Sequence, residues 1–355
     1  MSFMNSNAEP FPVWQGETPL VCRARCDAVR DCATFVLAAP DARRFDFDPG
    51  QFISLGVDLD GRTHWRAYSI ASSPNASDRL AISVKRVPGG RVSNWLLDHW
   101  HEGMALPARA PAGDFGLARD AELPPRIALF SAGSGITPLM SMTRWLLERE
   151  ASAGPVEIDF FHSARSDADV LYAEELRALA AAHPRFRLHL FLSQPEGRLP
   201  AHAGRLDAAR LRAALRTPDG LRAWLCGQPA YMDDVADWLG ELGVDAADIR
   251  RERYFSTAAE VAADAARHRL HVPAFGIDAE IAAGELLLDA LEGAGVPIVG
   301  ACRTGVCGSC KCKVEGDAGA VTSTSTVPLT ADEIAAGVVL ACSTTVNGEV
   351  SVSLA

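Results

Sequence analysis

The cysteines near the end of the chain have a spacing that suits an iron–sulfur cluster. Cys302, Cys307 and Cys310 follow the pattern C-x4-C-x2-C, and Cys342 comes later in the chain. This spacing is typical of the four thiolate ligands of a [2Fe–2S] cluster, with three from one tight loop and one from across the fold. Cys312 is then left without an iron, and we expect it to be a small buried side chain at the start of a strand.

Two alternatives compete with this interpretation of the cysteines. A structural zinc site also uses closely spaced cysteines, but its ligands usually come as two separated pairs, whereas here three stand together and one apart. Buried cysteines without a metal are the plainer alternative. Their crowding in the segment "ACRTGVCGSCKC" counts against it.

A second group of residues could bind a flavin. The segment "WRAYSIAS" offers a cation for a phosphate at Arg66, a flat ring at Tyr68 and a hydroxyl at Ser69. Further on, "KRVPGGRVSNWLL" places Gly90 and Ser93 just before a predicted helix, whose free N–H groups form an anion site suited to a pyrophosphate. Taken alone, each motif also fits an ordinary exposed strand or hairpin.

A third group could bind a nicotinamide dinucleotide. In "LFSAGSGITPLMSM", Gly133 and Gly135 permit a close backbone approach, and Thr137 is expected to cap the next helix, with Pro138 at its first position. The start of this helix could hold a pyrophosphate, although the segment departs from the G-x-G-x-x-G fingerprint. An ordinary strand-to-helix turn is the alternative.

Two further segments belong to the same predicted nucleotide site. Cys226 and Gly227 in "LCGQPAYM" end a strand at the carboxyl edge of a sheet, where ligands bind in such folds. A buried structural cysteine fits this local sequence nearly as well. Ser163 and Arg165 in "HSARSDAD" could hold the 2′-phosphate of NADPH, or could be surface residues at a turn.

The elements that must position these residues change in character along the chain. After an N-terminal tail, 1–18, residues 19–120 contain short strands separated by turn residues, which predicts an antiparallel β-barrel. Residues 121–255 alternate strands and helices, which predicts a mostly parallel sheet covered on both faces. An Ala-rich linker, 256–269, leads to a small α+β unit, 270–355. The expected fold class is therefore multidomain.

Within the last unit, we expect a hairpin across Gly276 and a helix that is closed by glycine at 285–295. Residues 338–346, "VVLACSTTV", and residues 349–354 are expected to be late strands.

Composition narrows the range of functions. The chain has 355 residues, which suits two or three domains, and a net charge of −11, which argues against a nucleic-acid surface and suits a basic partner. No run approaches the roughly 18 apolar residues that a membrane span needs. The N-terminus lacks the pattern of a secretory signal, so the nine cysteines are expected to lie in the reducing cytoplasm.

The motifs together resemble known families. "GACRTGVCGSCKCKVEGD" and "LACS" resemble the plant-type ferredoxin domain, which implies a β-grasp fold and Cys302, Cys307, Cys310 and Cys342 as iron ligands. The preceding segments, in their order, resemble the ferredoxin–NAD(P)H reductase superfamily, and the resemblance covers almost the whole chain. It implies FAD as the flavin.

The same resemblance implies a set of cofactor contacts. Those to the flavin are Arg66, Tyr68, Ser69, Ile70, Gly90, Val92 and Ser93, and those to the nucleotide are Gly133, Gly135, Thr137, Ser163, Arg165, Cys226, Gly227, Tyr231 and Met232. In "RRERYFS", Glu252 and an aromatic residue, Tyr254 or Phe255, would lie near the flavin. Ser69, Thr137, Cys226 and Glu252 would be the catalytic residues. Similarity to NADH enzymes favours NADH over NADPH.

These cofactors predict an electron-transfer function. Nicotinamide delivers two electrons together and an iron–sulfur cluster accepts one at a time, so a flavin is needed between them. The order flavin, NAD, ferredoxin resembles reductase components of bacterial multicomponent oxygenases. Segments such as "VPGGRVSNWL" and "STSTVPLTADEIAAG" fit two subgroups, reductases of Rieske-type oxygenases that demethylate quaternary amines such as glycine betaine, and reductases of the hybrid cluster protein. We favour the first.

The expected partner is therefore a terminal oxygenase, and the chain is expected to be a monomer. A redox sensor that binds the same cofactors without turnover is one alternative, but no DNA-binding segment or basic patch in the sequence supports it. A self-contained oxidase is another, and the sequence offers no haem motif or further metal motif for it.

Overall fold

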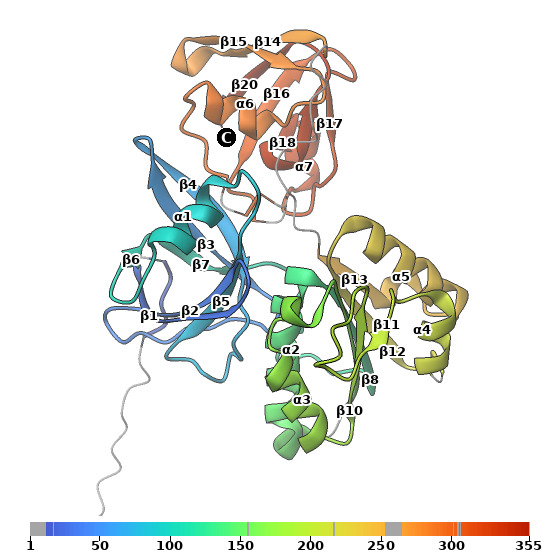
Figure 1. Cartoon of the computed structure of the whole chain (residues 1–355). Coiled ribbons are helices and arrows are strands. Elements are labelled where there is room, and N and C mark those ends of the chain that lie inside the picture. Colours follow the sequence, from blue (N-terminus) through green and yellow to red (C-terminus); the bar gives the residue numbers. More distant parts are fainter. Residues whose placement is uncertain are drawn as a thin grey trace, which may run out of the picture. The chain divides into compact units, whose positions relative to one another are not determined.

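The protein has several domains, and their sheets are of three kinds: antiparallel, parallel and mixed (Figure 1). This computed structural model describes residues 12–16, 18–154, 156–215, 217–252, 265–300, 302–303, 305 and 307–354. The chain divides into two compact units. The first comprises Met1–Ile53, Tyr68–Pro111 and Phe115–Glu252, and the second comprises Ser54–Ala67, Ala112–Asp114 and Arg253–Ala355.

The N-terminal part is built from short strands, as the sequence predicts. Strands β1 (Leu20–Val29), β2 (Cys32–Ala38), β5 (Leu80–Lys85) and β6 (Ala105–Leu106) form a four-stranded antiparallel sheet in the order β5-β2-β1-β6. Strands β3 (Phe52–Leu59), β4 (Arg62–Ser69) and β7 (Ala108–Ala112) form a second sheet in the order β4-β3-β7. The sequence did not predict β6 or β7, which are short and interrupted by Pro107.

One helix, α1 (Arg91–His99), follows β5 and corrects a detail of the predicted flavin motif. Gly90 is the residue that precedes the helix, so Ser93 lies within the first turn and not in front of it. After the helix, Trp100 is fully buried and its ring stacks on Phe35 of β2 at 4.7 Å between centroids, which fixes the end of the helix on the sheet.

The middle of the chain forms a six-stranded parallel sheet. Its order is β11-β10-β9-β8-β12-β13, with β8 (Arg126–Ala132), β9 (Glu157–Ala164), β10 (Phe186–Leu192), β11 (His202–Ala203), β12 (Leu221–Cys226) and β13 (Ile249–Glu252). The helices are α2 (Ile136–Ala153), α3 (Ala173–Ala182), α4 (Ala208–Ala214) and α5 (Pro229–Glu241). This arrangement confirms the α/β fold that the alternating sequence predicts.

Both faces of this sheet are buried, and alternate residues of β8 show why. Ile127 and Leu129 pack in one hydrophobic cluster with residues of α2 and α3, whereas Ala128 and Phe130 pack in another with residues of α4 and α5. In Figure 1 these helix pairs flank the sheet. Strands that are buried on both faces carry an unbroken apolar run, as "IALF" within β8 does.

The strand order reverses next to β8, which is where a nucleotide site is expected in such a sheet. From β8 the chain proceeds to β9 and β10 on one side, and then returns to β12 and β13 on the other. In open α/β sheets, ligands bind at the carboxyl ends of the strands where the order reverses. The loops that follow β8 and β12 therefore meet at the position where the sequence places Gly133, Gly135 and Gly227.

The last part of the chain is a small α+β domain. Its main sheet has the order β15-β14-β20-β16-β18, with β14 (Arg267–Val272), β15 (Ile277–Ala282), β16 (Lys311–Gly316), β18 (Val338–Leu340) and β20 (Val350–Leu354). A second pair comprises β17 (Val321–Ser323) and β19 (Thr344–Val346). Helix α6 (Leu287–Gly293) packs Leu287, Leu288 and Leu291 into the core of the sheet, and α7 (Ala331–Ala335) precedes β18.

Two predictions for this domain differ from the structure. The expected continuous strand at 338–346 is broken by a 3₁₀ turn, Ala341–Ser343, which contains Cys342. In addition, β14 begins at Arg267, inside the segment expected to be a linker, whereas residues 256–264 of that segment lie outside the described residues. The hairpin across Gly276 is present, and this glycine has a φ of +61°.

No helix among the described residues is long and apolar enough to cross a membrane.

The close approach of the loops after β8 and β12 depends on Gly135, and this gives a first prediction. A Cβ at Gly135 would lie 2.1 Å from the carbonyl oxygen of Cys226, so Gly135→Ala forces the two loops apart. We expect a loss of about 1–3 kcal/mol in the free energy of unfolding, measured by urea titration, together with weaker NADH binding. Gly240→Ala is the matched control, because a Cβ on this glycine of α5 meets nothing within 4 Å. Equal stability of both variants would contradict the prediction.

Candidate redox centres

The structure brings together the four cysteines that the spacing selects. The side chains of Cys302 and Cys310 lie within hydrogen-bonding reach of Cys342, and Cys307 lies within the same reach of Cys302. Cys302, Cys310 and Cys342 are buried and Cys307 is half-buried. The Sγ atom of Cys307 is also 3.1 Å from the hydroxyl of Ser309.

The electrostatics of these thiols fit a bound cationic centre. Contact with Cys302 and Cys310, together with burial, raises the pKa of Cys342, and contact with Cys302 and burial raise that of Cys307. The pKa of Cys310 is lowered, chiefly because the Cys342 thiol donates to it. Several thiolates crowded in a buried site repel one another, whereas iron ions would neutralise them. This donor set therefore fits a [2Fe–2S] cluster.

Cys312 stands apart from this group. It lies in β16, where it pairs with Val339 of β18 and Leu354 of β20, and it is fully buried in the hydrophobic core of the domain. Burial raises the pKa of Cys312 to about 12, so the thiol stays protonated at neutral pH. Cys312 is therefore a buried core side chain, as the sequence predicts.

Two glycines shape the loop that carries three of the cysteines. Gly305 and Gly308 have φ values of +76° and +74°, which L-residues with side chains rarely adopt. Ser325 packs against this loop, because its hydroxyl donates to the carbonyl of Gly305 at 2.7 Å and its own carbonyl accepts from the hydroxyl of Ser343 at 3.3 Å. Ser325 thus connects the loop to the turn of Cys342, a role the sequence did not reveal.

A buried cation next to the loop was also not predicted. Arg303 follows Cys302 directly, is 8% exposed and has a φ of +57°, a conformation that costs a residue with a side chain about 1–2 kcal/mol. Its guanidinium forms ion pairs with Asp289 and Glu292 of α6. Burial raises the pKa of Asp289, while the charge of Arg303 opposes this rise.

The predicted flavin residues lie around the end of β4. Ser69 and Ile70 are buried, and the N–H of Ile70 donates to the carbonyl of Gln51 at 2.9 Å. Arg66 and Tyr68 precede them on the same strand and are partly exposed, and Arg66 Nη1 donates to the carbonyl of Trp65 at 2.7 Å. The strand therefore presents a cation, a ring and a hydroxyl in the predicted order.

The second predicted flavin motif forms a tight turn before α1. A Cβ at Gly90 would lie 2.6 Å from the hydroxyl of Ser93 and 2.9 Å from Cβ of Val87, so this position suits glycine alone. Val92 is buried and Ser93 is largely buried. The helix start is thus available as the anion site that the sequence predicts.

Three of the four predicted catalytic residues meet around one carboxylate. The hydroxyl of Ser69 donates to Oε2 of Glu252 at 3.5 Å, and the thiol of Cys226 donates to the same oxygen at 3.8 Å. Cys226 and Glu252 are partners in the register of β12 and β13, so the sheet itself sets their spacing. The carboxylate can orient both groups at the end of the flavin strand.

Thr137 does not cap its helix, which corrects the sequence prediction. A 3₁₀ turn, Gly133–Gly135, runs directly into α2, so Gly135 precedes the helix and Pro138 stands at its third position and not its first. The hydroxyl of Thr137 donates instead to the carbonyl of Ser134 at 3.2 Å. Gly133 has a φ of +56°, and Gly227 lies so close to Ala132 that a Cβ there would be 2.9 Å from its side chain.

Residues of α2 also contact the segment that follows the flavin strand. Ser141 donates to the carbonyl of Ser72 at 2.7 Å, and Glu148 accepts from Ser73 at 2.5 Å and from Asn75 at 2.8 Å. Ser141 and Glu148 are seven residues apart and so share one face of the helix. This polar stripe on a mostly apolar helix is a signal that the sequence analysis did not use.

The predicted 2′-phosphate site is not assembled as one cradle. Ser163 lies next to Tyr231. Burial raises the pKa of Tyr231, and the hydroxyl of Ser163 opposes this rise. Arg165 is exposed and donates to Gln194 at 3.1 Å. Met232 lies in α5 and is fully buried in the core between this helix and the sheet, and its contact with adenine stays a prediction. Tyr254 and Phe255 lie outside the described residues.

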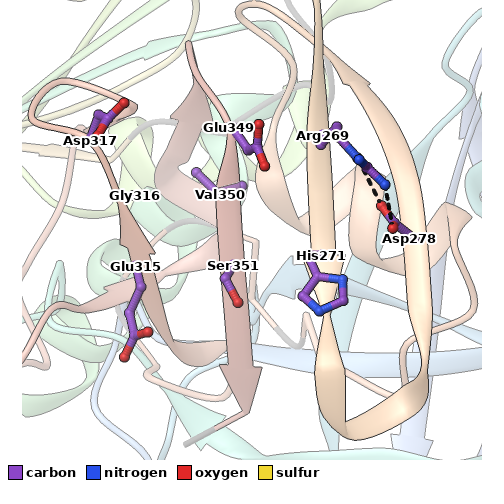
Figure 2. Close-up of a pocket in the computed structure, with 9 residues that line it drawn as sticks. All are labelled: Arg269, His271, Asp278, Glu315, Gly316, Asp317, Glu349, Val350 and Ser351. Carbon is purple, nitrogen blue, oxygen red and sulfur yellow. Dashed lines mark hydrogen bonds and ion pairs between the residues drawn. The ribbon is translucent and has the colours of Figure 1, made fainter.

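A surface groove of about 480 Å³ on the last domain contains none of the predicted cofactor residues (Figure 2). It is lined by Arg269, His271, Asp278, Glu315, Gly316, Asp317, Glu349, Val350 and Ser351. Most of these residues are polar, and they lie on or next to β14, β15, β16 and β20 of the mixed sheet.

Comparisons with known proteins agree with this set of sites. Three family models match the chain in succession: an oxidoreductase FAD-binding domain at residues 20–116, an oxidoreductase NAD-binding domain at 129–237 and a 2Fe-2S iron-sulfur cluster binding domain at 272–347. A glycine betaine monooxygenase reductase subunit of Pseudomonas aeruginosa is 36% identical, and the alignment covers 90% of each chain. The chain belongs to the ferredoxin–NAD(P)H reductase-like flavoproteins with a C-terminal [2Fe–2S] domain.

Two further proteins are similar over most of their length. The NADH oxidoreductase HCR of Escherichia coli is 34% identical over 86% of this chain and 88% of its own. The crystal structure of a phthalate dioxygenase reductase shares the fold, with a TM-score of 0.68, 23% identity, and coverage of 95% of this chain and 98% of the other. The family establishes that this flavoprotein is an NAD(P)H-dependent oxidoreductase whose cofactors are FAD, a nicotinamide dinucleotide and a [2Fe–2S] cluster.

The cysteine geometry gives a prediction for the iron ligands. Cys342→Ser is expected to abolish the visible [2Fe–2S] spectrum and the reduction of cytochrome c, while reduction of FAD by NADH continues. Cys312→Ser is the matched control and should keep the cluster, because this side chain belongs to the core. A cluster that survives Cys342→Ser and is lost in Cys312→Ser would show the ligand set to be wrong.

The shared carboxylate gives a prediction for hydride transfer. Glu252→Gln keeps the shape but removes the charge that orients Ser69 and Cys226, so flavin reduction by NADH should slow by roughly 10-fold to 10²-fold. Stopped-flow absorbance of the flavin measures this rate. Glu241→Gln, on an exposed carboxylate of α5, is the control and should leave the rate unchanged. An unchanged rate in Glu252→Gln would rule out this role.

Proposed function

We propose that this protein is the NADH-dependent reductase component of a Rieske-type monooxygenase that demethylates a quaternary amine. The observation that carries the proposal is the presence, in one chain, of the Ser69–Glu252–Cys226 group and of the four gathered thiols. The chain's similarity to a glycine betaine monooxygenase reductase subunit, over 90% of both chains, supports the choice of partner.

The cofactors carry out the electron transfer, and residues of the chain hold the cofactors in place. When bound, NADH supplies a hydride, FAD accepts it and releases electrons singly, and the [2Fe–2S] cluster passes them on one at a time. Gly135 and Gly227 let the loops after β8 and β12, which would hold the dinucleotide, approach each other closely, and the carboxylate of Glu252 holds Ser69 and Cys226 where the two rings would meet. We propose Cys302, Cys307, Cys310 and Cys342 as the iron ligands.

Further features bear on the finer assignments. Arg165 engages Gln194 and is separate from the buried Ser163, which supports NADH over NADPH. All nine cysteines are free thiols, which supports a reducing, cytoplasmic location. We also propose that the reductase acts as a monomer and docks to its oxygenase transiently.

A second candidate function is the NADH-dependent reduction of the hybrid cluster protein. The observation in its favour is the 34% identity to the NADH oxidoreductase HCR of Escherichia coli. A redox sensor that binds the cofactors without turnover is a third candidate. These alternatives differ in the acceptor and in turnover, so one reconstitution separates them.

The test is a reconstitution with purified acceptors under NADH. We expect steady NADH oxidation coupled to demethylation of glycine betaine when a glycine betaine-type oxygenase component is added, with NADPH at least about tenfold less effective. Reduction of the hybrid cluster protein but not of the oxygenase would favour the second candidate. Bound cofactors without turnover towards any acceptor, including cytochrome c and ferricyanide, would identify a sensor.

A further inference from the structure

An ion-pair triad of one buried arginine and two half-buried carboxylates joins the cysteine loop to α6, and the proposed function does not explain it. Arg303 Nη1 is 2.7 Å and 2.9 Å from the two carboxylate oxygens of Glu292, and Nη2 pairs with Asp289. Arg303 occupies a backbone conformation that glycine would adopt without strain. The side chain at this position must therefore contribute something that a glycine could not.

The triad is fixed tightly against the loop. A Cβ at Gly300 would lie 2.4 Å from Cδ2 of Leu288 and 3.3 Å from Nη1 of Arg303, so the chain before Cys302 runs directly over α6. Arg303 immediately follows Cys302 in the chain. Its guanidinium is thus held against the backbone at Gly300, two residues before the first proposed iron ligand, and the ion pairs with α6 determine where its charge lies.

The charges of the triad do not cancel. One guanidinium faces two carboxylates, which leaves a net charge of −1. The side chain of Arg303 is 9% exposed, and those of Asp289 and Glu292 are 25% and 34% exposed. Solvent and salt therefore screen these charges less than they screen charges on the open surface.

A fixed charge beside an iron–sulfur centre changes the ease of its reduction. Two ferric irons, two sulfides and four thiolates together would make an anionic centre, and reduction would add one more negative charge. A neighbouring negative charge disfavours this step and a positive charge favours it, so net charge near the cluster is one determinant of its reduction potential.

We propose that Arg303, Asp289 and Glu292 set the reduction potential of the cluster, the carboxylates lowering it and Arg303 limiting that effect. This inference rests on the proposed cluster ligands and deepens the proposed function, because the potential decides which acceptor proteins the domain can reduce. Arg303 is a positioning residue in this account, since it also ties the loop to α6.

The test compares variants that change the charge with little change in shape. Asp289→Asn and Glu292→Gln each remove a negative charge and should raise the potential, Arg303→Gln should lower it, and the double variant Arg303→Gln/Asp289→Asn should return near the wild type. Titration with dithionite and redox mediators, followed by the EPR signal of the reduced cluster, measures these potentials. Each single change should alter the ratio of reduced to oxidised cluster about tenfold at a given potential, or about 59 mV.

A matched ion pair on the same domain serves as the control. Arg269 and Asp278 form an exposed pair on β14 and β15, in the groove of Figure 2. Arg269→Gln and Asp278→Asn change the charge by the same amounts, but solvent screens them, so the potential should not move. A similar shift in these variants would show that net charge of the domain, and not the triad, is responsible.

The signs of the shifts separate this proposal from a purely structural role. If the triad only holds the loop, the variants lose iron content and visible circular dichroism without an ordered change in potential. Should Arg303→Gln fail to hold a cluster, the two carboxylate variants still decide, because both must raise the potential at normal iron content. Unchanged potentials in loaded carboxylate variants overturn the inference, whereas a wild-type protein without a cluster overturns the proposed function instead.

Discussion

The contact of one carboxylate with two donors is the constraint on which the redox function depends in our proposal. Glu252 accepts from Ser69 at the end of a flavin-domain strand and from Cys226 at the end of a central strand of the α/β sheet. Hydride transfer requires the two rings to meet in a fixed geometry, and a small misplacement is costly. A rigid sheet register on one side and a buried strand end on the other provide that geometry more reliably than loops would.

Much of the fold could be predicted because its signals are local. The apolar strand "RIALFSA" and the helix that follows have the periodicity of buried α/β elements, and the observed β8 and α2 fall where this pattern predicts. The cysteine spacing likewise predicts which thiols gather and that Cys312 enters the core. Such features need only near neighbours in the chain, or a ligand pattern that chemistry restricts strongly.

What the sequence could not reveal depends on contacts between distant segments. The turn at Ala341–Ser343 looks like part of a strand, because each of its residues can occupy a strand and only the tertiary fold interrupts it. The prediction that Thr137 caps α2 was wrong for a similar reason. A 3₁₀ turn precedes α2, so the helix begins two residues earlier than the sequence indicates. The partners of Arg303 and Ser325 are separated from them in sequence and have no motif.

The interruption of the strand at Cys342 has a consequence for how this domain is assembled. Because the fourth thiol sits between β18 and β19, an iron centre that binds it closes the chain from Cys310 to Cys342 into a covalent loop. Such a closure restricts the unfolded chain in the same way as a disulfide, but without a bond between two cysteines. A metal centre bound in this way would cross-link the last domain, and without iron or sulfide the domain would lose that cross-link while the rest of the chain kept its own cores.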